Sequence, residues 1–168
     1  MRTDPEIFIP LENGNPLDEV LTERYENFDI YWYHWPHDGP RWFSLFMREE
    51  DYEPVIVIYC NDEVSCVITR PHWEYHYSSV KEEGLEVPPK ILFEDEWHPA
   101  LTKTKVNIRE FELKKLDLTP HSYSPNITKS ERISQKFRTG LGHNSRIGKP
   151  PVQDPADIAQ EAYEYYCA

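Results

Sequence analysis

The fold is decided by residues 54–69, PVIVIYCNDEVSCVIT. The first part of this stretch is apolar at consecutive positions, which is typical of a central strand covered on both faces. The Asn-Asp pair at 61–62 forms a tight turn, and the β-branched run that follows indicates a returning strand. The stretch therefore predicts a β-hairpin at the centre of a sheet.

The three cysteines are interpreted as free thiols. With a two-residue turn, Cys60 lies opposite Glu63 and Cys66 opposite Val57, so these two cysteines do not face each other. The third is Cys167, and an odd number without a secretory leader does not indicate a disulfide framework. No apolar run is long enough to span a bilayer. We therefore expect a cytoplasmic protein, in a reducing setting, with no membrane partner.

Further short strands are predicted on both sides of the hairpin, because several segments are rich in aromatic and β-branched residues or alternate in polarity. These segments are residues 28–35, 41–47, 72–77, 90–97 and 105–113. The first has rings on both faces, so we expect core on one side and a helix, the tail or a partner on the other.

Three helices are predicted near the ends of the chain. The first begins at Asn15-Pro16 and runs to about residue 27, because apolar residues recur there at helical spacing. A capping box at 128–131 predicts a short helix to about residue 139. The pair Asp154-Pro155 opens the last one. Its expected packing stripe is Ile158, Ala159, Ala162, Tyr163 and Tyr166.

Together these elements predict a single-domain α+β fold. It has a mainly antiparallel sheet of about six short strands, an N-terminal helix, and an extended tail with two short C-terminal helices. The 168 residues carry a net charge of −12, with −13 on residues 1–118, +5 on 119–150 and −4 on 151–168. We therefore divide the chain into an acidic β-rich body, 1–118, and a tail, 119–168, that is basic and proline-rich and ends in the last helix. The negative body argues against general nucleic-acid binding.

Two segments combine imidazoles and carboxylates at alternate positions, which on a strand share one face. If the strands pair, these side chains give the ligand set of a catalytic zinc site or a non-haem iron site. The candidate ligands are His72, Glu74, His76, Glu94, Glu96 and His98. The simpler interpretation is an amphipathic strand with polar residues outward, and it implies no cofactor. No motif identifies catalytic residues.

Aromatic residues of the body and basic residues of the tail are the candidates for an interaction surface, because Trp and Arg are frequent binding hot spots. They are Trp32, Trp35, Trp42, Arg132, Lys136, Arg138, Arg146 and Lys149.

Two functions fit these features, and the sequence does not decide whether the protein is an enzyme. The leading hypothesis is a non-catalytic protein-interaction module, such as an inhibitor, an immunity-like protein or an accessory subunit, with an acidic body and a basic docking tail. Its partner is another protein, or a second copy bound through the tail. The alternative is a metal-dependent hydrolase or oxygenase that uses the His/Glu cluster with a zinc or iron ion.

Overall fold

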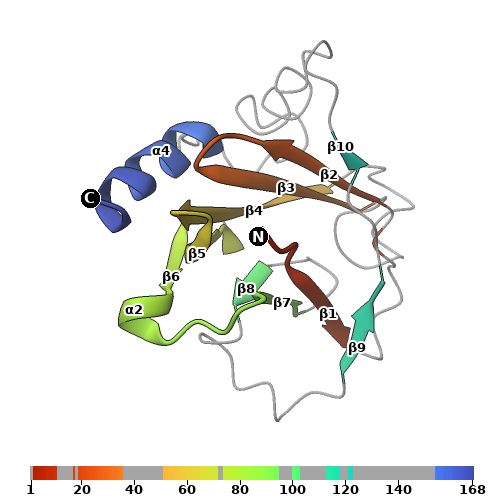
Figure 1. Ribbon diagram of the computed structural model, residues 1–168. Coiled ribbons are helices and arrows are strands. Elements are labelled where there is room, and N and C mark those ends of the chain that lie inside the picture. The colour runs from red at the N-terminus through yellow and green to blue at the C-terminus, as the bar shows by residue number, and fades with distance from the viewer. Residues whose placement is uncertain are drawn as a thin grey trace.

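A computed structural model of the protein describes residues 2–10, 17, 19–35, 51–71, 74–94, 100–102, 113–117, 121–122 and 154–168. Within these residues the chain forms two β-sheets and two helices. Figure 1 shows the two sheets and the C-terminal helix as successive layers, with the six-stranded sheet in the middle.

The six-stranded sheet has the order β10-β2-β3-β4-β5-β6. Its strands are β10 (His121–Ser122), β2 (Glu19–Arg24), β3 (Phe28–Trp35), β4 (Asp51–Cys60), β5 (Glu63–Thr69) and β6 (His76–Ser79). Its neighbours are antiparallel except β10 and β2, which run parallel. Strand β4 lies inside the sheet and is buried from Pro54 to Tyr59, which confirms the prediction of a central strand covered on both faces.

The four-stranded sheet has the order β8-β7-β1-β9. Its strands are β8 (Ala100–Thr102), β7 (Lys90–Phe93), β1 (Glu6–Pro10) and β9 (Leu113–Leu116). Strand β1 pairs parallel with β7 and antiparallel with β9. Two helices complete the described chain: α2 (Val80–Glu83) and α4 (Pro155–Tyr166). These are the helices that the described residues form, and neither of them is long and apolar enough to cross a membrane.

The central hairpin forms as predicted, with one irregularity. Asn61 and Asp62 have φ values of 53° and 63°, the left-handed conformation that a two-residue hairpin turn requires. Cys60 lies opposite Glu63, as expected. A bulge at Ile58/Tyr59 then shifts the register, because β5 contributes one extra residue there. Cys66 therefore lies opposite Ile58, and the predicted pairing with Val57 is wrong.

The predicted α+β fold is wrong. It has an N-terminal helix and a single sheet, whereas the described residues form two sheets and begin with strands. No helix spans the described residues before 27, because 19–24 form β2, in which Val20 pairs with Tyr33 and Leu21 with Trp32. A strand covered on both faces carries apolar residues on both sides, and here they mimic helical spacing. Residues 6–10 form an inner strand, β1, of a second sheet. The predicted helix at 128–139 lies outside the described residues, so one C-terminal helix is seen.

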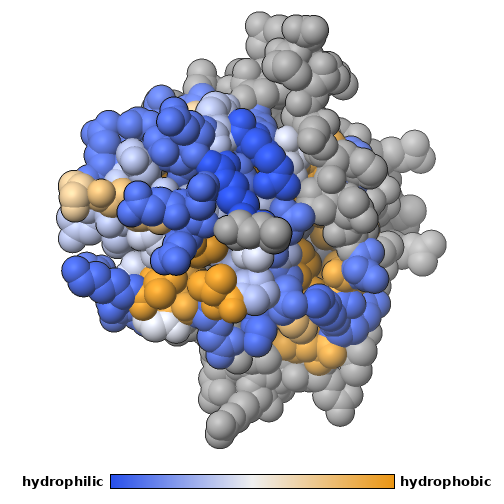
Figure 2. Space-filling view, in the orientation of Figure 1, coloured by the Kyte–Doolittle hydropathy of each residue, from blue (hydrophilic) through white to orange (hydrophobic). Residues whose placement is uncertain are grey.

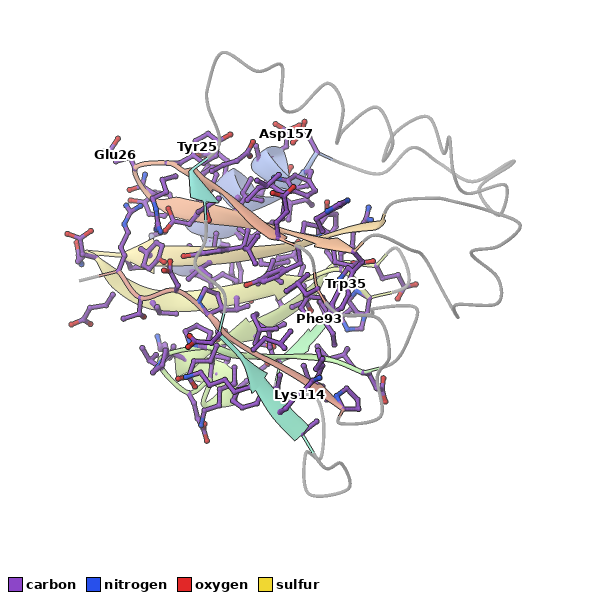
Figure 3. The ribbon with its side chains drawn as sticks, turned by 90° about the vertical axis from the view of Figure 1, so that its right-hand side faces the viewer. Tyr25, Glu26, Trp35, Phe93, Lys114 and Asp157 are labelled. Carbon is purple, nitrogen blue, oxygen red and sulfur yellow. A yellow bond between two sulfur atoms is a disulfide. The ribbon has the colours of Figure 1, made fainter. Side chains whose placement is uncertain are left out.

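The core between the sheets is largely aromatic. Strand β3 contributes Tyr31, Tyr33 and Trp35, which are 0%, 1% and 0% exposed. The ring of Phe93 on β7 lies edge-on to Tyr33 and to Trp35, with both centroid distances at 5.1 Å. Figure 3 shows Trp35 and Phe93 side by side in this layer. The even-numbered residues of β3 face α4, so the expectation that both faces of this strand are covered is confirmed.

The prediction of free thiols is wrong for two of the three cysteines. Cys60, at the end of β4, forms a disulfide with Cys167, which follows α4. Cys66 is a free, buried thiol. The two bonded positions are 107 residues apart in sequence, so no local pattern indicates the pairing.

Candidate interaction surface

Helix α4 is positioned by its cap and by one apolar face. The Asp154 carboxylate accepts a hydrogen bond from the backbone N–H of Ala156 at 3.0 Å, and Pro155 occupies the first turn. The face against the sheet consists of Ile158, Ala159 and Ala162, which are buried, with Tyr163 and Tyr166 partly buried. These contacts reach β3, β4 and β5 and confirm the predicted helix start and packing stripe.

The opposite face of α4 is exposed and acidic. Asp157, Glu161 and Glu164 recur there at helical spacing, and all three are exposed. Tyr165 is 70% exposed, and its ring meets that of Tyr166 edge-on at a centroid distance of 4.8 Å. An exposed tyrosine therefore lies among carboxylates on this helix.

Helix α2 adds a second acidic segment. Ser79 caps it by accepting a hydrogen bond from the backbone N–H of Glu82 at 2.9 Å. Gly84 ends it with a φ of 67°, a conformation that glycine adopts more readily than most residues with a Cβ. Between the caps, Glu82 and Glu83 are exposed, together with one basic residue, Lys81.

The turn between β4 and β5 is the third acidic segment. It carries Asp62 and Glu63, both exposed. The disulfide between Cys60 and Cys167 brings the end of α4 next to this turn. Three segments far apart in the sequence therefore meet at one side of the molecule, where Figure 1 shows α4 and α2 with β6 between them.

Electrostatic effects connect α2, β6 and α4. The pKa of Tyr77, on β6, is raised by burial first and then by the negative charge of Glu161 on α4. The pKa of Tyr166, on α4, is raised by burial first, then by Cys66 and by Glu82 on α2. A carboxylate of α4 thus lies close enough to act on a tyrosine of β6, and a carboxylate of α2 lies close enough to act on a tyrosine of α4.

We call this surface the acidic face. It consists of Asp62, Glu63, Glu82, Glu83, Asp157, Glu161 and Glu164, with the exposed ring of Tyr165. Apolar side chains border it, because Val80 is 37% and Val87 54% exposed. Figure 2 shows this side as mainly hydrophilic over α4, with a hydrophobic patch lower down near α2. Carboxylates beside an aromatic ring and aliphatic groups suit a partner that offers both positive charge and apolar area.

The structure describes three of the six candidate metal ligands. Glu74 precedes β6 in a turn, where its backbone N–H bonds to Pro71 O at 3.2 Å, and its Oε2 lies 3.9 Å from Nε2 of His76. Glu94 follows β7, which pairs with β1 and β8, whereas β6 pairs with β5. His76 therefore lies in a strand of the six-stranded sheet, whereas Glu94 adjoins a strand of the four-stranded sheet.

His72, Glu96 and His98 lie outside the described residues. Among the residues that are described, no group of three or more His, Cys, Asp or Glu side chains is arranged to hold a metal ion. The six-residue ligand set and its zinc or iron ion stay a prediction.

The candidate interaction residues fall into two groups. Trp32 and Trp35 are 4% and 0% exposed, so both rings lie in the core, Trp32 on the side of α4 and Trp35 between the sheets. The others lie outside the described residues: Trp42, Arg132, Lys136, Arg138, Arg146 and Lys149. The basic tail stays a prediction, as does the division of the chain at residues 118 and 119.

A buried carboxylate lies at the same end of the six-stranded sheet as the β4–β5 turn. Asp29 is 0% exposed, and its oxygens lie 3.0 Å from Arg2 Nη1 and 2.7 Å from Arg24 Nη1. The hydroxyl of Tyr59 donates to Asp29 at 3.2 Å. Burial raises the pKa of Asp29, and the two arginines and Tyr59 act against that rise. Asp29 thus joins the N-terminal segment to β2, β3 and β4.

Replacing Asp29 with alanine is expected to lower the free energy of unfolding by about 2–3 kcal/mol, somewhat less than for a fully buried ion pair, because both guanidinium groups reach solvent. Urea denaturation measures the loss. Asp62→Asn is the matched control, since Asp62 is 76% exposed and lies 3.8 Å from Arg2, and asparagine tolerates its φ of 63°. Its expected cost is below about 0.5 kcal/mol. Equal losses in the two variants would contradict the structural role of Asp29.

The acidic face was not predicted from the sequence as a site. The spacing of Asp157, Glu161 and Glu164 opposite the apolar stripe is visible in the sequence and indicates the exposed side of α4. The proximity of α2 and of the β4–β5 turn depends on the sheet order and on a disulfide, neither of which has a local signal.

Comparison of the chain with models of protein families, with curated proteins and with solved structures found no match.

Proposed function

We propose that this chain is a non-catalytic protein-interaction module, of the kind that serves as an inhibitor, an immunity protein or an accessory subunit, and that its acidic face binds a basic segment of a partner protein. The observation that carries the proposal is Tyr165, which is 70% exposed on a helix whose outer face also carries three carboxylates and Gln160. Tyrosine supplies a large, rigid contact area and a hydroxyl, and it is enriched in binding hot spots.

The charge of the acidic face defines the chemistry of the partner. Seven exposed carboxylates and one lysine, Lys81, lie on α2, α4 and the β4–β5 turn. A field of this sign attracts lysine and arginine side chains over a distance of about 10 Å at moderate ionic strength. It repels phosphate groups, so the proposed partner is a protein and not a nucleic acid.

The apolar border adds short-range contacts to this attraction. Val80 and Val87 lie next to the charged residues of α2, and both are partly exposed. A basic segment that also carries aliphatic residues would cover these valines and the ring of Tyr165 while its cations pair with the carboxylates. We therefore expect affinity for peptides that combine arginine with leucine, and less for arginine alone.

The test is the affinity of a fluorescein-labelled synthetic peptide of alternating arginine and leucine, measured by fluorescence anisotropy at low and at high salt. Reversing two charges, Glu161→Lys with Glu164→Lys, is expected to weaken binding at least about tenfold, which is about 1.4 kcal/mol. High salt should weaken binding to the unchanged protein, because the attraction is screened.

A double variant elsewhere on the surface is the matched control for net charge. Glu74 and Asp117 are exposed and lie outside α2, α4 and the β4–β5 turn, so Glu74→Lys with Asp117→Lys gives the same total charge. We expect this variant to bind within about threefold of the unchanged protein, because neither residue lies on an element of the acidic face and salt screens exposed charges beyond about 10 Å. Equal losses of affinity in the two double variants would show that the peptide is attracted to the total negative charge of the protein. That result would contradict binding at a defined site.

A further inference from the structure

We propose that the Cys60–Cys167 disulfide is a redox latch that holds α4 on the six-stranded sheet and thereby keeps the acidic face assembled. The effect of the latch on binding depends on the proposed function. The latch itself is inferred only from the way in which α4 is attached to the sheet. The bond joins the residue that ends β4 to the residue that caps α4. It therefore acts at the point where the helix meets the acidic β4–β5 turn.

The described contacts of α4 hold it weakly without this bond. Of the three fully buried residues in its packing stripe, two are alanines, Ala159 and Ala162, and only Ile158 is large. The rings of Tyr163 and Tyr166 complete the stripe and are only partly buried. Small side chains remove little apolar area from water, so they contribute little to docking. The last turn contains Glu164 and no basic residue, which places negative charge at the negative end of the helix dipole. A twelve-residue helix of this kind is marginal by itself.

The disulfide can be reached by a reductant, because Cys60 and Cys167 are both partly exposed. A dithiol reductant acts by thiol–disulfide exchange. Its thiolate attacks one sulfur and forms a mixed disulfide, the other protein sulfur leaves as a thiolate, and the second thiol of the reductant then displaces the first protein sulfur. Two electrons and two protons pass to Cys60 and Cys167, and the reductant becomes a disulfide.

The third cysteine does not compete in this exchange. Cys66 is buried on the sheet face beneath α4, and burial raises the pKa of its thiol to about 12. It is therefore protonated at neutral pH, and the thiolate is the form that attacks disulfides. Cys66→Ser accordingly keeps the latch and serves as the matched control.

Opening the latch has two structural consequences. The apolar face beneath α4, which includes Ile30, Ile56 and Ile68, loses its cover when the helix leaves. Glu161, Glu164 and Tyr165 also leave the neighbourhood of α2, so the acidic face no longer presents its carboxylates together. The oxidised protein is therefore the binding form and the reduced protein the released form.

The experiment compares the full chain before and after treatment with dithiothreitol. The quantity measured is the rate of amide hydrogen exchange in residues 158–166. Alkylation under denaturing conditions should count one thiol in the oxidised protein and three in the reduced protein. We expect exchange in α4 to be at least about tenfold faster after reduction, in Cys60→Ser and in Cys167→Ser, while β3 and β4 stay protected. Cys66→Ser should respond to dithiothreitol like the unchanged protein. Three thiols before reduction, or the same exchange of α4 in both states, would overturn the latch.

The arginine-leucine peptide separates this inference from the proposed function. Both stand if the oxidised protein binds the peptide at least about tenfold more tightly than the reduced protein and α4 exchange changes as expected. A change in α4 exchange without peptide binding in either state refutes the proposed function and leaves the latch. Equal binding in both states with unchanged α4 exchange refutes the latch and leaves the proposed function.

Discussion

Trp35→Ala is expected to lower the free energy of unfolding by about 3–5 kcal/mol, the usual cost of removing a large aromatic side chain from a close-packed core. The Trp35 side chain is 0% exposed between the two sheets, with the ring of Phe93 at 5.1 Å. The cavity would lie between β3 and β7, where neither sheet can move inward without breaking its own pairing. Urea denaturation followed by circular dichroism measures the change.

The matched control for Trp35 is the exposed aromatic residue of α4. Tyr165→Ala removes a ring that is 70% exposed and should change stability by less than about 0.5 kcal/mol. The same substitution should weaken binding of the arginine-leucine peptide, whereas Trp35→Ala should affect binding only through unfolding. A stable Trp35→Ala variant with impaired binding would indicate that Trp35 contacts the partner, as the sequence suggested. It would contradict the position of Trp35 in the core.

Ending the chain before Asp154 is expected to lower the free energy of unfolding by at least about 5 kcal/mol. Closing a loop of about 100 residues is worth about 4–5 kcal/mol in the chain-entropy model, and this deletion removes the Cys60–Cys167 bond. It also exposes the apolar face of β3, β4 and β5 that α4 covers, and one buried isoleucine contributes about 1.5–3 kcal/mol. Since domains of this size have about 5–15 kcal/mol in total, the truncated chain should keep its sheets with only a small remaining stability.

Far-UV circular dichroism and urea denaturation of the truncated chain measure this loss. Glu161→Gln with Glu164→Gln is the control, because it changes the outer face of α4 and keeps the buried stripe and the disulfide. A truncated chain as stable as the full one would show that the stability of the sheets does not depend on α4. It would also favour the division of the chain into an independent body and a tail.

The parts of the fold that were predictable from the sequence have strong local signals. The run from Val55 to Tyr59 is apolar at every position, and the turn residues Asn61 and Asp62 tolerate positive φ. The hairpin could therefore be predicted from these residues. The start of α4 was equally clear, because Asp154-Pro155 combines a cap with a preferred first residue.

The parts that could not be predicted depend on contacts far apart in the sequence. Strand β2 shows helical spacing and becomes a strand because it pairs with β3 and because its two faces pack into different core layers, with Val20 in one and Leu21 against the other. Strand β1 pairs with β7 across some 80 residues, and this pairing creates the second sheet. The bulge at Ile58/Tyr59 reflects how β4 and β5 twist together, and no residue type marks it.

The candidate site was predictable only in part. The acidic composition of the body supported the idea of a basic partner, and the spacing of the outward carboxylates of α4 is also visible in the sequence. The tryptophans suggested as anchors are core residues, because a strand between two layers needs rings on both faces. Bringing α2 and the β4–β5 turn beside α4 requires the complete sheet order and the disulfide.

The central claim is that a basic segment docks on the acidic face. The most direct measurement is a titration of isotope-labelled protein with the arginine-leucine peptide, followed by amide chemical-shift changes in NMR spectra. The account predicts saturable changes concentrated in residues 61–63, 80–86 and 157–165, and their loss in the Glu161→Lys, Glu164→Lys variant. Changes spread over the whole surface, or centred on the four-stranded sheet, would contradict the account.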